Sequence, residues 1–193
     1  MAESILTKQA IARSLKELSL VKGFDKISIG EISQNCNINR QTFYYHFQDK
    51  YALLKWIYMN ELLIPNMSEL NFDNWSEKLL NAMQIMVLDK AFYTNTIRHA
   101  GEYITQYLME NTKFLFVKAI DALDQRSTIS EDERDFFAKF FSYGLCGMVV
   151  EWVHGGMVID PHVMAEYMEK LLSSCETAAY KYKTGVLNPS AQN

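Results

Sequence analysis

The chain has 193 residues, of which 49% are hydrophobic and 13% aromatic, and its net charge is −4. This composition excludes a globally disordered chain, and the charge argues against a protein that binds nucleic acid over its whole surface. The charge is unevenly spread, because residues 1–55 carry eight Lys and Arg against five Asp and Glu, whereas residues 56–193 carry eleven against eighteen. A basic head on an acidic body is expected when only one end of a molecule meets a polyanion.

Cysteine usage and the apolar segments predict a soluble protein of the cytoplasm. Cys36, Cys146 and Cys175 are odd in number and far apart, so neither a disulfide framework nor a zinc site fits. The N-terminus has no long apolar run and does not resemble a secretory signal. The most apolar region, residues 136–158, contains two charged residues and is interpreted as a core helix rather than a membrane span.

Hydrophobic positions recur mostly at three- and four-residue spacing, which predicts an all-α protein. In the first helix, Thr7 is expected to be the N-cap. Ile11, Leu15 and Leu18 form one apolar stripe along this helix, which should end near Gly23.

A second, short helix is predicted after "SIGE". Ser28 and Glu31 have the spacing of a capping box, in which the serine accepts from the third helical N–H and the glutamate accepts in return. Asn37 follows the helix where a tight turn would favour glycine. Asparagine is the best substitute there, because it tolerates the left-handed conformation.

A third helix is predicted within "NINRQTFYYHFQDK", residues 37–50. Asn39 is its expected N-cap, and Ile38 should pack against Phe43 as a hydrophobic staple. Phe43 and Phe47 lie four residues apart and should face inward. The opposite, outward face should then carry Arg40, Gln41, Tyr44 and Tyr45.

Longer helices are predicted after this segment. Asp49 should cap a fourth helix that runs to Pro65, and Gly101 should separate two further helices. Ser130 and Glu133 form a second capping box, which opens a helix that ends at Gly155-Gly156. The expected later helices span about 74–89, 91–99, 102–125, 130–154 and 161–182.

Two short helices separated by a tight turn and braced by a longer first helix make a helix-turn-helix unit, whose second helix enters the major groove of DNA. Arg40 and Gln41 are the residue types that read guanine and adenine edges. Hydroxyl, phenol and ammonium groups suit phosphate contacts. His46 is ambiguous, since it could equally brace the tyrosine rings. The predicted DNA-binding residues are Ser28, Arg40, Gln41, Thr42, Tyr44, Tyr45, His46 and Lys50.

The stretch "ISIGEISQNCNINRQTFYYHFQDKYALL" closely resembles the DNA-binding head of TetR-family transcriptional regulators, and the similarity covers about residues 7–55. The family signature Thr-x-Tyr-x-His-Phe-x-x-Lys aligns with Thr42, Tyr44, His46, Phe47 and Lys50. The resemblance implies phosphate contacts at the Thr, Tyr and Lys positions and base contacts just before the Thr. The chain departs from the family at 36–38, where Cys-Asn-Ile replaces the common Ala-Gly-Val. Within the family, the sequence RQTFYYHF and the size of the body are most similar to those of regulators of dihydroxyacetone kinase operons.

The expected organisation is a three-helix DNA-binding head joined by a fourth helix to a larger helical body. We predict a helix-turn-helix domain at residues 1–48, with its motif at about 28–47. An effector-binding and dimerisation domain should follow at 49–185, and a flexible tail at 186–193.

The body contains a set of aromatic side chains that could line an effector cavity, because such pockets are apolar with few polar groups. Ordinary core packing is the competing interpretation for each of them. His99 and Glu102 have a spacing that could suit a metal, but no third ligand is evident, so neither a metal nor a cofactor is expected. The candidate effector-binding residues are Tyr93, His99, Tyr103, Tyr107, Phe140, Tyr143 and Trp152.

Two functional hypotheses remain at this point. In the first, the chain is a homodimeric regulator, a repressor, that binds a near-palindromic DNA operator and responds to a small-molecule effector. The family resemblance places its dimer interface on the last two long helices. In the second, it is a co-regulator or activator whose body receives a partner protein, and an apolar patch would lie exposed. An enzyme finds no support, because no phosphate loop or nucleophile–base set is present.

Overall fold

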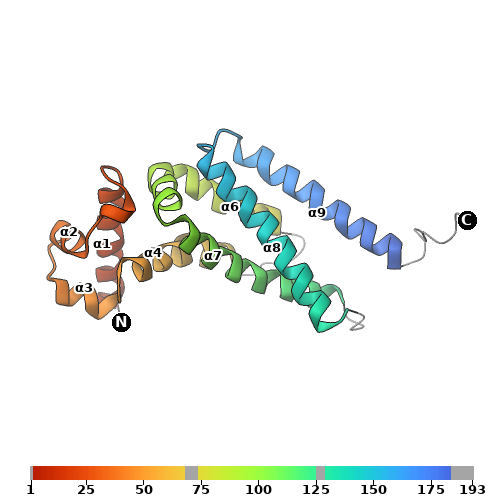
Figure 1. Cartoon of the computed structure of the whole chain (residues 1–193), viewed down its shortest axis with the longest axis horizontal. Coiled ribbons are helices and arrows are strands. Elements are labelled where there is room, and N and C mark those ends of the chain that lie inside the picture. Colours follow the sequence, from red (N-terminus) through yellow and green to blue (C-terminus); the bar gives the residue numbers. More distant parts are fainter. Residues whose placement is uncertain (1, 68–73, 125–128, 184–193) are drawn as a thin grey trace, which may run out of the picture.

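The computed structural model describes residues 2–67, 74–124 and 129–183, and within these ranges every regular element is helical. Figure 1 shows an elongated molecule with a small head at one end and longer helices at the other. The head is built from α1 (Ala2–Ser19), the short 3-10 turn η1 (Phe24–Lys26), α2 (Ile29–Asn35) and α3 (Arg40–His46). The predicted all-α architecture with a three-helix head is therefore confirmed.

The remaining helices form the body. After α4 (Lys50–Tyr58), the chain passes through the π-helical turn η2 (Met59–Leu63) and α5 (Ile64–Met67) to α6 (Trp75–Leu88), α7 (Lys90–Leu123), α8 (Glu131–His154) and α9 (Pro161–Lys183). Helix α7 packs along α8, and α9 lies against α6. Side chains of the head and of the body join in one continuous apolar core that runs through α4 and α7.

Local capping chemistry explains why the helices begin where they do. The Asn39 side chain accepts from the N–H of Thr42 at 2.7 Å, and that of Asp49 accepts from the N–H of Ala52 at 2.7 Å. Both capping boxes are complete, at the start of α2 and at the start of α8. Each cap satisfies an amide that the helix itself leaves without a partner. The predicted N-caps that the structure confirms are Ser28, Asn39, Asp49 and Ser130.

Three predicted boundaries differ in the structure. The first helix begins at Ala2 and ends at Ser19, so Thr7 lies inside it and was wrongly assigned as the cap. Pro65 does not end the fourth helix, because α4 already gives way to the π-helical turn η2 after Tyr58. Pro65 is the second residue of α5, a position in the first helical turn where a proline is tolerated. The break expected at Gly101 is a kink at Ala100 within α7 (φ −134°, ψ 22°). The predicted tail, 186–193, lies outside the described residues.

The turn between α2 and α3 depends on one residue with a left-handed backbone. Asn37 has φ 55°, as the sequence predicted, and the N–H of Ile38 then donates to the carbonyl of Ser33 at 3.0 Å. An L-residue other than Asn or Asp adopts this conformation at a cost of roughly 1–2 kcal/mol, whereas glycine adopts it freely. The turn therefore restricts position 37 to very few residue types.

We predict that Asn37→Ala lowers the free energy of unfolding of the head by about 1 kcal/mol, whereas Asn37→Gly leaves it unchanged within about 0.5 kcal/mol. Urea denaturation followed by circular dichroism measures both values. Gln34→Ala, an exposed position on the neighbouring helix, serves as the control. Equal effects of alanine and glycine at position 37 would contradict the assigned role of the left-handed turn.

A second prediction concerns the acidic residue of the head's capping box. Lys22 and then the Ser28 hydroxyl bond the Glu31 carboxylate and lower its pKa from 4.5 to about 2. A carboxyl whose pKa is depressed by folding stabilises the fold above its unfolded pKa and loses that contribution as the pH falls toward its folded pKa.

Wild type should therefore be more stable than Glu31→Gln at pH 7, and the difference should vanish between about pH 5 and pH 2. Thermal melting across this pH range measures the difference, and Glu102→Gln, an exposed carboxylate on α7, controls for loss of charge in general. A difference between wild type and Glu31→Gln that is independent of pH would refute the assignment.

Candidate nucleic-acid interface

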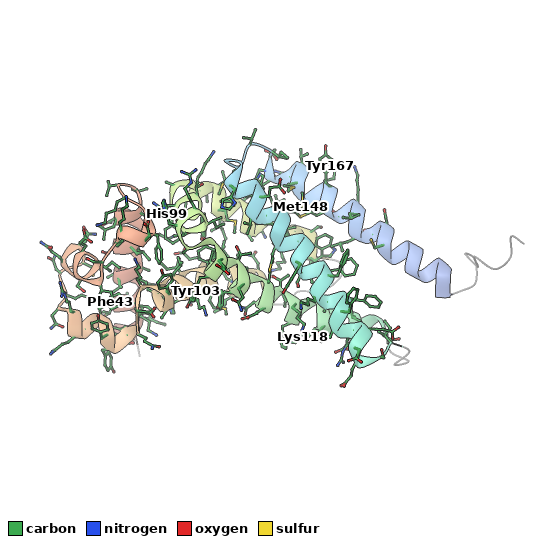
Figure 2. The ribbon with its side chains drawn as sticks, in the orientation of Figure 1. Phe43, His99, Tyr103, Lys118, Met148 and Tyr167 are labelled. Atoms are coloured by element: carbon green, nitrogen blue, oxygen red, sulfur yellow. The ribbon has the colours of Figure 1, made fainter. Side chains whose placement is uncertain are left out.

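Helix α3 lies at the outer edge of the head and is held down by two phenylalanines (Figure 2). Phe43 has no exposed surface, and Phe47 is also buried. Their rings lie 5.9 Å apart, and the ring of Phe47 packs edge-on against Trp56 of α4 at 5.9 Å. The inward face predicted from the four-residue spacing is confirmed, and it leaves the opposite face of a seven-residue helix free.

The outward face of α3 combines rings and polar groups in contact with solvent. Tyr44 is 55% exposed and Tyr45 is 83% exposed, while Arg40 and Gln41 are also exposed. Large rings are costly to leave in water, and an exposed group of them in a polar setting is typical of a binding surface. The ring of His46 meets that of Tyr45 edge-on at 5.0 Å, which favours the bracing role for this histidine.

The Arg40 side chain lies against α2. Its guanidinium lies over the backbone of Gly30 in α2, so closely that a Cβ at Gly30 would come within 2.5 Å of a guanidinium nitrogen. The missing side chain of Gly30 therefore provides the space that the guanidinium occupies. This placement keeps the arginine at the exposed N-terminal end of α3, where base edges are read in helix-turn-helix complexes.

Two predicted phosphate-binding hydroxyls already have partners. The Thr42 hydroxyl donates to the side-chain oxygen of Asn39 at 3.0 Å, and the Ser28 hydroxyl donates to the Glu31 carboxylate at 2.7 Å. Either hydroxyl must rotate away from its acceptor in order to donate to a phosphate. Capping is thus the role that the structure assigns to these two groups in the free protein.

Lys50 has a structural role that the sequence analysis missed. Its ammonium donates to the carbonyls of Phe24, Asp25 and Ile27 at 2.9, 2.8 and 2.9 Å, and it lies 4.8 Å from the centre of the Phe24 ring. All three donors of the ammonium are used, and burial lowers its pKa. Lys50 therefore closes the turn that connects α1 to α2, and a phosphate contact through the same group stays a prediction.

The seven body residues predicted to bind an effector fall into separate environments. Tyr93 is buried and donates to the Glu61 carboxylate at 3.3 Å, and burial followed by the charge of Glu61 raises the pKa of its phenol. Trp152 is buried, and its indole N–H donates to the Ile159 carbonyl at 2.8 Å. Core packing with one satisfied polar group accounts for both residues.

The remaining five candidates lie near the surface. His99 pairs with Asp25 of the head at 3.0 Å, and the rings of Tyr103 and Tyr107 lie beside the Lys55 ammonium. Phe140 and Tyr143 are exposed on α8. The structure thus brings Tyr103 and Tyr107 together and leaves the other candidates apart, so a shared effector cavity stays a prediction.

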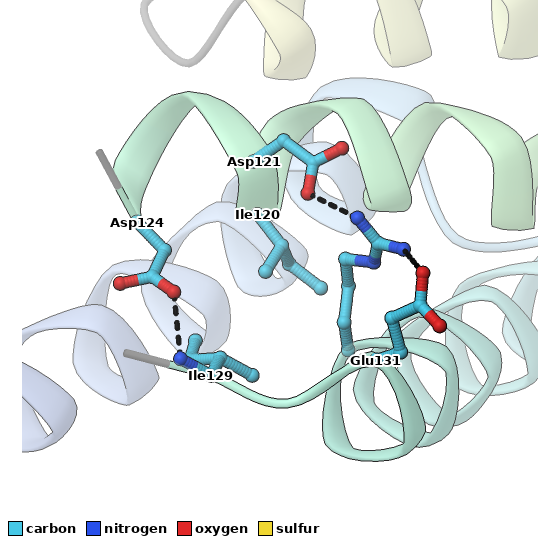
Figure 3. Close-up of a pocket in the computed structure, with 6 residues that line it drawn as sticks. Ile120, Asp121, Asp124, Ile129 and Glu131 are labelled. Atoms are coloured by element: carbon cyan, nitrogen blue, oxygen red, sulfur yellow. Dashed lines mark hydrogen bonds and ion pairs between the residues drawn. The ribbon is translucent and has the colours of Figure 1, made fainter. Parts of the chain in front are cut away.

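A cavity of about 340 Å³ lies elsewhere, at the far end of α7 and α8 (Figure 3). Arg134 crosses it and pairs with Asp121 and Glu131, and the Asp124 carboxylate accepts from the N–H of Ile129 at 2.7 Å. Its polar groups are already paired, which is not typical of a pocket for an apolar ligand. Among the described residues, no three His, Cys, Asp or Glu side chains gather to hold a metal ion.

Helix α8 is long and apolar enough to cross a membrane by length and composition, and it alone meets that test among the described residues. Core helices of soluble proteins meet the same test. Only a third of its most apolar part is buried within the chain. The large side chains that it leaves exposed are Phe136, Phe137, Phe140, Tyr143 and Met148.

Comparisons with known proteins agree with this architecture. A model of the family described as bacterial regulatory proteins, tetR family, matches residues 11–57, and one described as transcriptional regulator C-terminal region matches residues 73–174. The chain is 26% identical over 162 residues to the HTH-type dhaKLM operon transcriptional activator DhaS of Lactococcus lactis subsp. lactis (strain IL1403). That alignment covers 83% of this chain and 86% of the relative.

Solved structures share the fold along most of its length. A structure of the dihydroxyacetone kinase operon activator DhaS superposes with a TM-score of 0.67 at 24% identity, covering 88% of this chain and 96% of that one. NalD, the secondary repressor of the MexAB-OprM multidrug efflux pump in Pseudomonas aeruginosa, superposes with a TM-score of 0.64 at 19% identity, covering 89% and 96%. With both family models matched in order along the sequence, the chain belongs to the TetR family of transcriptional regulators, which bind DNA, act as dimers and are not enzymes.

Proposed function

We propose that this protein is a cytoplasmic regulator that binds a near-palindromic operator with the α3 helices of two copies. The observation that carries the proposal is the two-sided character of α3. Phe43 and Phe47 fasten one face to the head, while Arg40, Gln41, Tyr44 and Tyr45 stand exposed on the other. A short helix that is buried on one side and rich in donors on the other is suited to the major groove.

Within this surface we assign base recognition and phosphate binding to different residues. Arg40 and Gln41 lie in the first turn of α3 and can make bidentate bonds to base edges. Tyr44, Tyr45 and Thr42 would contact the phosphate backbone, together with Ser28 and Lys50 at the edges of the motif, and His46 would brace the Tyr45 ring. Residues 1–48 would form this DNA-binding domain, and residues 49–185 the regulatory and dimerisation domain.

The surface of α8 and α9 supports the proposed dimer interface. Phe140 on α8 is 66% exposed, and Tyr167 and Leu171 on α9 are also exposed. The five large side chains left uncovered on α8 are more than a stable monomer normally leaves in contact with water. A second copy related by a two-fold axis would bury the same surface on both chains.

Two routes of regulation remain open to test. A small molecule could bind in the body, with Tyr93, His99, Tyr103, Tyr107, Phe140, Tyr143 and Trp152 as the candidate residues, and release the DNA as a repressor does. Alternatively, a partner protein could bind the body, and the chain would act as an activator. The relative's name, dhaKLM operon transcriptional activator, supports activation rather than repression, and the name of the solved structure supports a dihydroxyacetone kinase operon as the regulated one.

Selection of bound duplexes from a random library tests the proposed function directly. We expect a near-palindrome whose half-sites lie about one helical turn, or a multiple of it, apart. Recovery of asymmetric single sites bound by a monomer would contradict the proposal. The genes that flank genomic copies of the operator would identify the regulated operon.

Arg40→Ala should weaken binding to the selected operator by about 1–3 kcal/mol and relax the preference at one base pair, because a bidentate base contact is lost. Tyr44→Phe should weaken binding to every sequence alike, since it removes a phosphate contact. Titration of cognate and scrambled duplexes by both variants measures the two effects. If both variants changed the base preferences in the same way, the assignment of base recognition to Arg40 and of phosphate contact to Tyr44 would be wrong.

Lys50→Ala should lower the slope of log K against log salt by roughly one, because one cation that neutralises phosphate is lost. Tyr44→Phe changes no charge and is the matched control with an unchanged slope. The structure adds a second expected effect, because three carbonyls lose a charged donor and the head should melt at a lower temperature. An unchanged salt slope in a folded Lys50→Ala protein would contradict the phosphate contact and leave Lys50 with its structural role alone.

Phe140→Glu should convert the dimer, of twice 22.4 kDa, to a monomer at micromolar concentration, because a charge would be buried in the interface. Operator affinity should then fall by roughly 10²- to 10⁴-fold, as expected when two linked contacts become one. Leu88→Glu places the same charge at an exposed apolar position on α6 and should leave the dimer intact. Sedimentation measures both variants, and a dimeric Phe140→Glu protein would exclude this interface.

A further inference from the structure

The head is fastened to the body by a side-chain amide that the DNA-binding motif does not contain. Asn95 lies in α7, and its amide nitrogen donates to the carbonyls of Ser19 and Lys22 at 2.7 and 2.8 Å. Its amide oxygen accepts from the N–H of Phe24 at 2.8 Å. One side chain of the body therefore bonds three backbone groups, one at the last residue of α1 and two in the segment that links α1 to α2.

An amide is suited to this position in a way that other side chains are not. The two carbonyls require donors and the Phe24 N–H requires an acceptor, so only a group with both functions at this spacing satisfies all three. A carboxylate would keep the bond to Phe24 but would face two carbonyl oxygens without a proton. The partly buried setting makes each unsatisfied group costly.

The position of Asn95 along α7 connects this contact to the rest of the body. The helix is kinked at Ala100, five residues further on, and α7 packs along α8. His99, just before the kink, pairs with Asp25 and lies against Gly23 of the same linking segment (Figure 2). The piece of α7 before the kink thus contacts the head through Asn95 and His99, and it also meets the last turn of α8, where a ring nitrogen of His154 lies 3.4 Å from the Ile97 carbonyl oxygen.

The ion pairs between head and body are less specific in geometry. Lys16 of α1 pairs with Glu61 and Asp89, but these are flexible charged groups that are partly exposed and screened by salt. Point charges of this kind tolerate a change of angle. Three hydrogen bonds to one planar amide do not, because their strength falls steeply with misalignment.

We propose that Asn95 is a positioning residue that fixes the orientation of the head on the body, and so sets the separation of the two α3 helices in the dimer. The proposal rests on the proposed function, since it assumes two heads on one operator. A movement of α7 about the Ala100 kink would pass to the head through this amide. Asn95 would thereby determine which half-site spacing the dimer accepts.

The test uses the full-length chain and the variant Asn95→Ala, with Asn111→Ala as the matched control. Asn111 lies on the same helix, and its amide donates to the Tyr107 carbonyl at 2.8 Å without reaching the head. Binding is measured to duplexes that carry the selected half-sites at a series of spacings. We expect the preference of wild type for its best spacing to fall about tenfold in Asn95→Ala and to remain in Asn111→Ala.

A second measurement separates this proposal from the proposed function, because it needs no DNA. A nitroxide carried by a noncanonical amino acid at Gln34, an exposed position of α2, reports the distance between the two heads by pulsed EPR. The distance distribution should be narrow in wild type and Asn111→Ala and broad in Asn95→Ala. If no duplex were preferred by wild type while this contrast persisted, DNA reading would fail and the positioning role would stand.

Two outcomes would overturn the positioning role. One is an Asn95→Ala protein with the spacing preference and the distance distribution of wild type. The other is an Asn95→Ala protein whose head is unfolded by circular dichroism, since the amide would then maintain the fold of the head rather than its orientation. Asn95→Asp provides a further check, because it keeps only the bond to the Phe24 N–H and should behave like alanine rather than rescue the wild-type distribution.

Discussion

The arrangement of the head depends on how the backbone polar groups between the last residue of α1 and the first residue of α2 are bonded, because the 3-10 turn η1 is the regular element between these helices. Lys50 of α4 donates to three of these carbonyls, and Asn95 of α7 bonds two further carbonyls and one N–H. Buried backbone groups must find partners, and here the partners come from the two helices that enter the body. The same bonds that complete the head therefore also attach it.

The recognition helix shows how a short element is stabilised so that one face remains available. Seven residues are too few for a helix that is stable alone. The cap at Asn39, the left-handed turn at Asn37 and the packing of Phe43 and Phe47 supply what its length cannot. Because the cap and the inner face stabilise the helix, the outer face can carry exposed tyrosines and an arginine that suit binding.

The body follows a different principle, in which part of the apolar surface is left unburied within one chain. Helix α8 contacts α7 along one side, while aromatic side chains on its other sides remain in water. This uncovered surface explains why the segment has the composition of both a core helix and a membrane span. A second copy would bury it, which would make the spacing of the two heads a property of the assembly rather than of either chain.

Features that arise from neighbours three or four residues apart could be predicted from the sequence. Caps at Ser28, Asn39 and Ser130, the turn at Asn37 and the inward pair of phenylalanines were all predictable, because helix geometry relates such positions locally. Partners that meet across long separations could not be predicted, because they depend on how the helices pack. Examples are Lys50 with carbonyls 23–26 residues earlier and Asn95 with groups 71–76 residues earlier. The candidate effector residues lie in separate parts of the body, because helix packing rather than local sequence places them. Aromatic composition shows which side chains can line a cavity, but the direction in which each one points is set by helix packing, which local sequence does not encode.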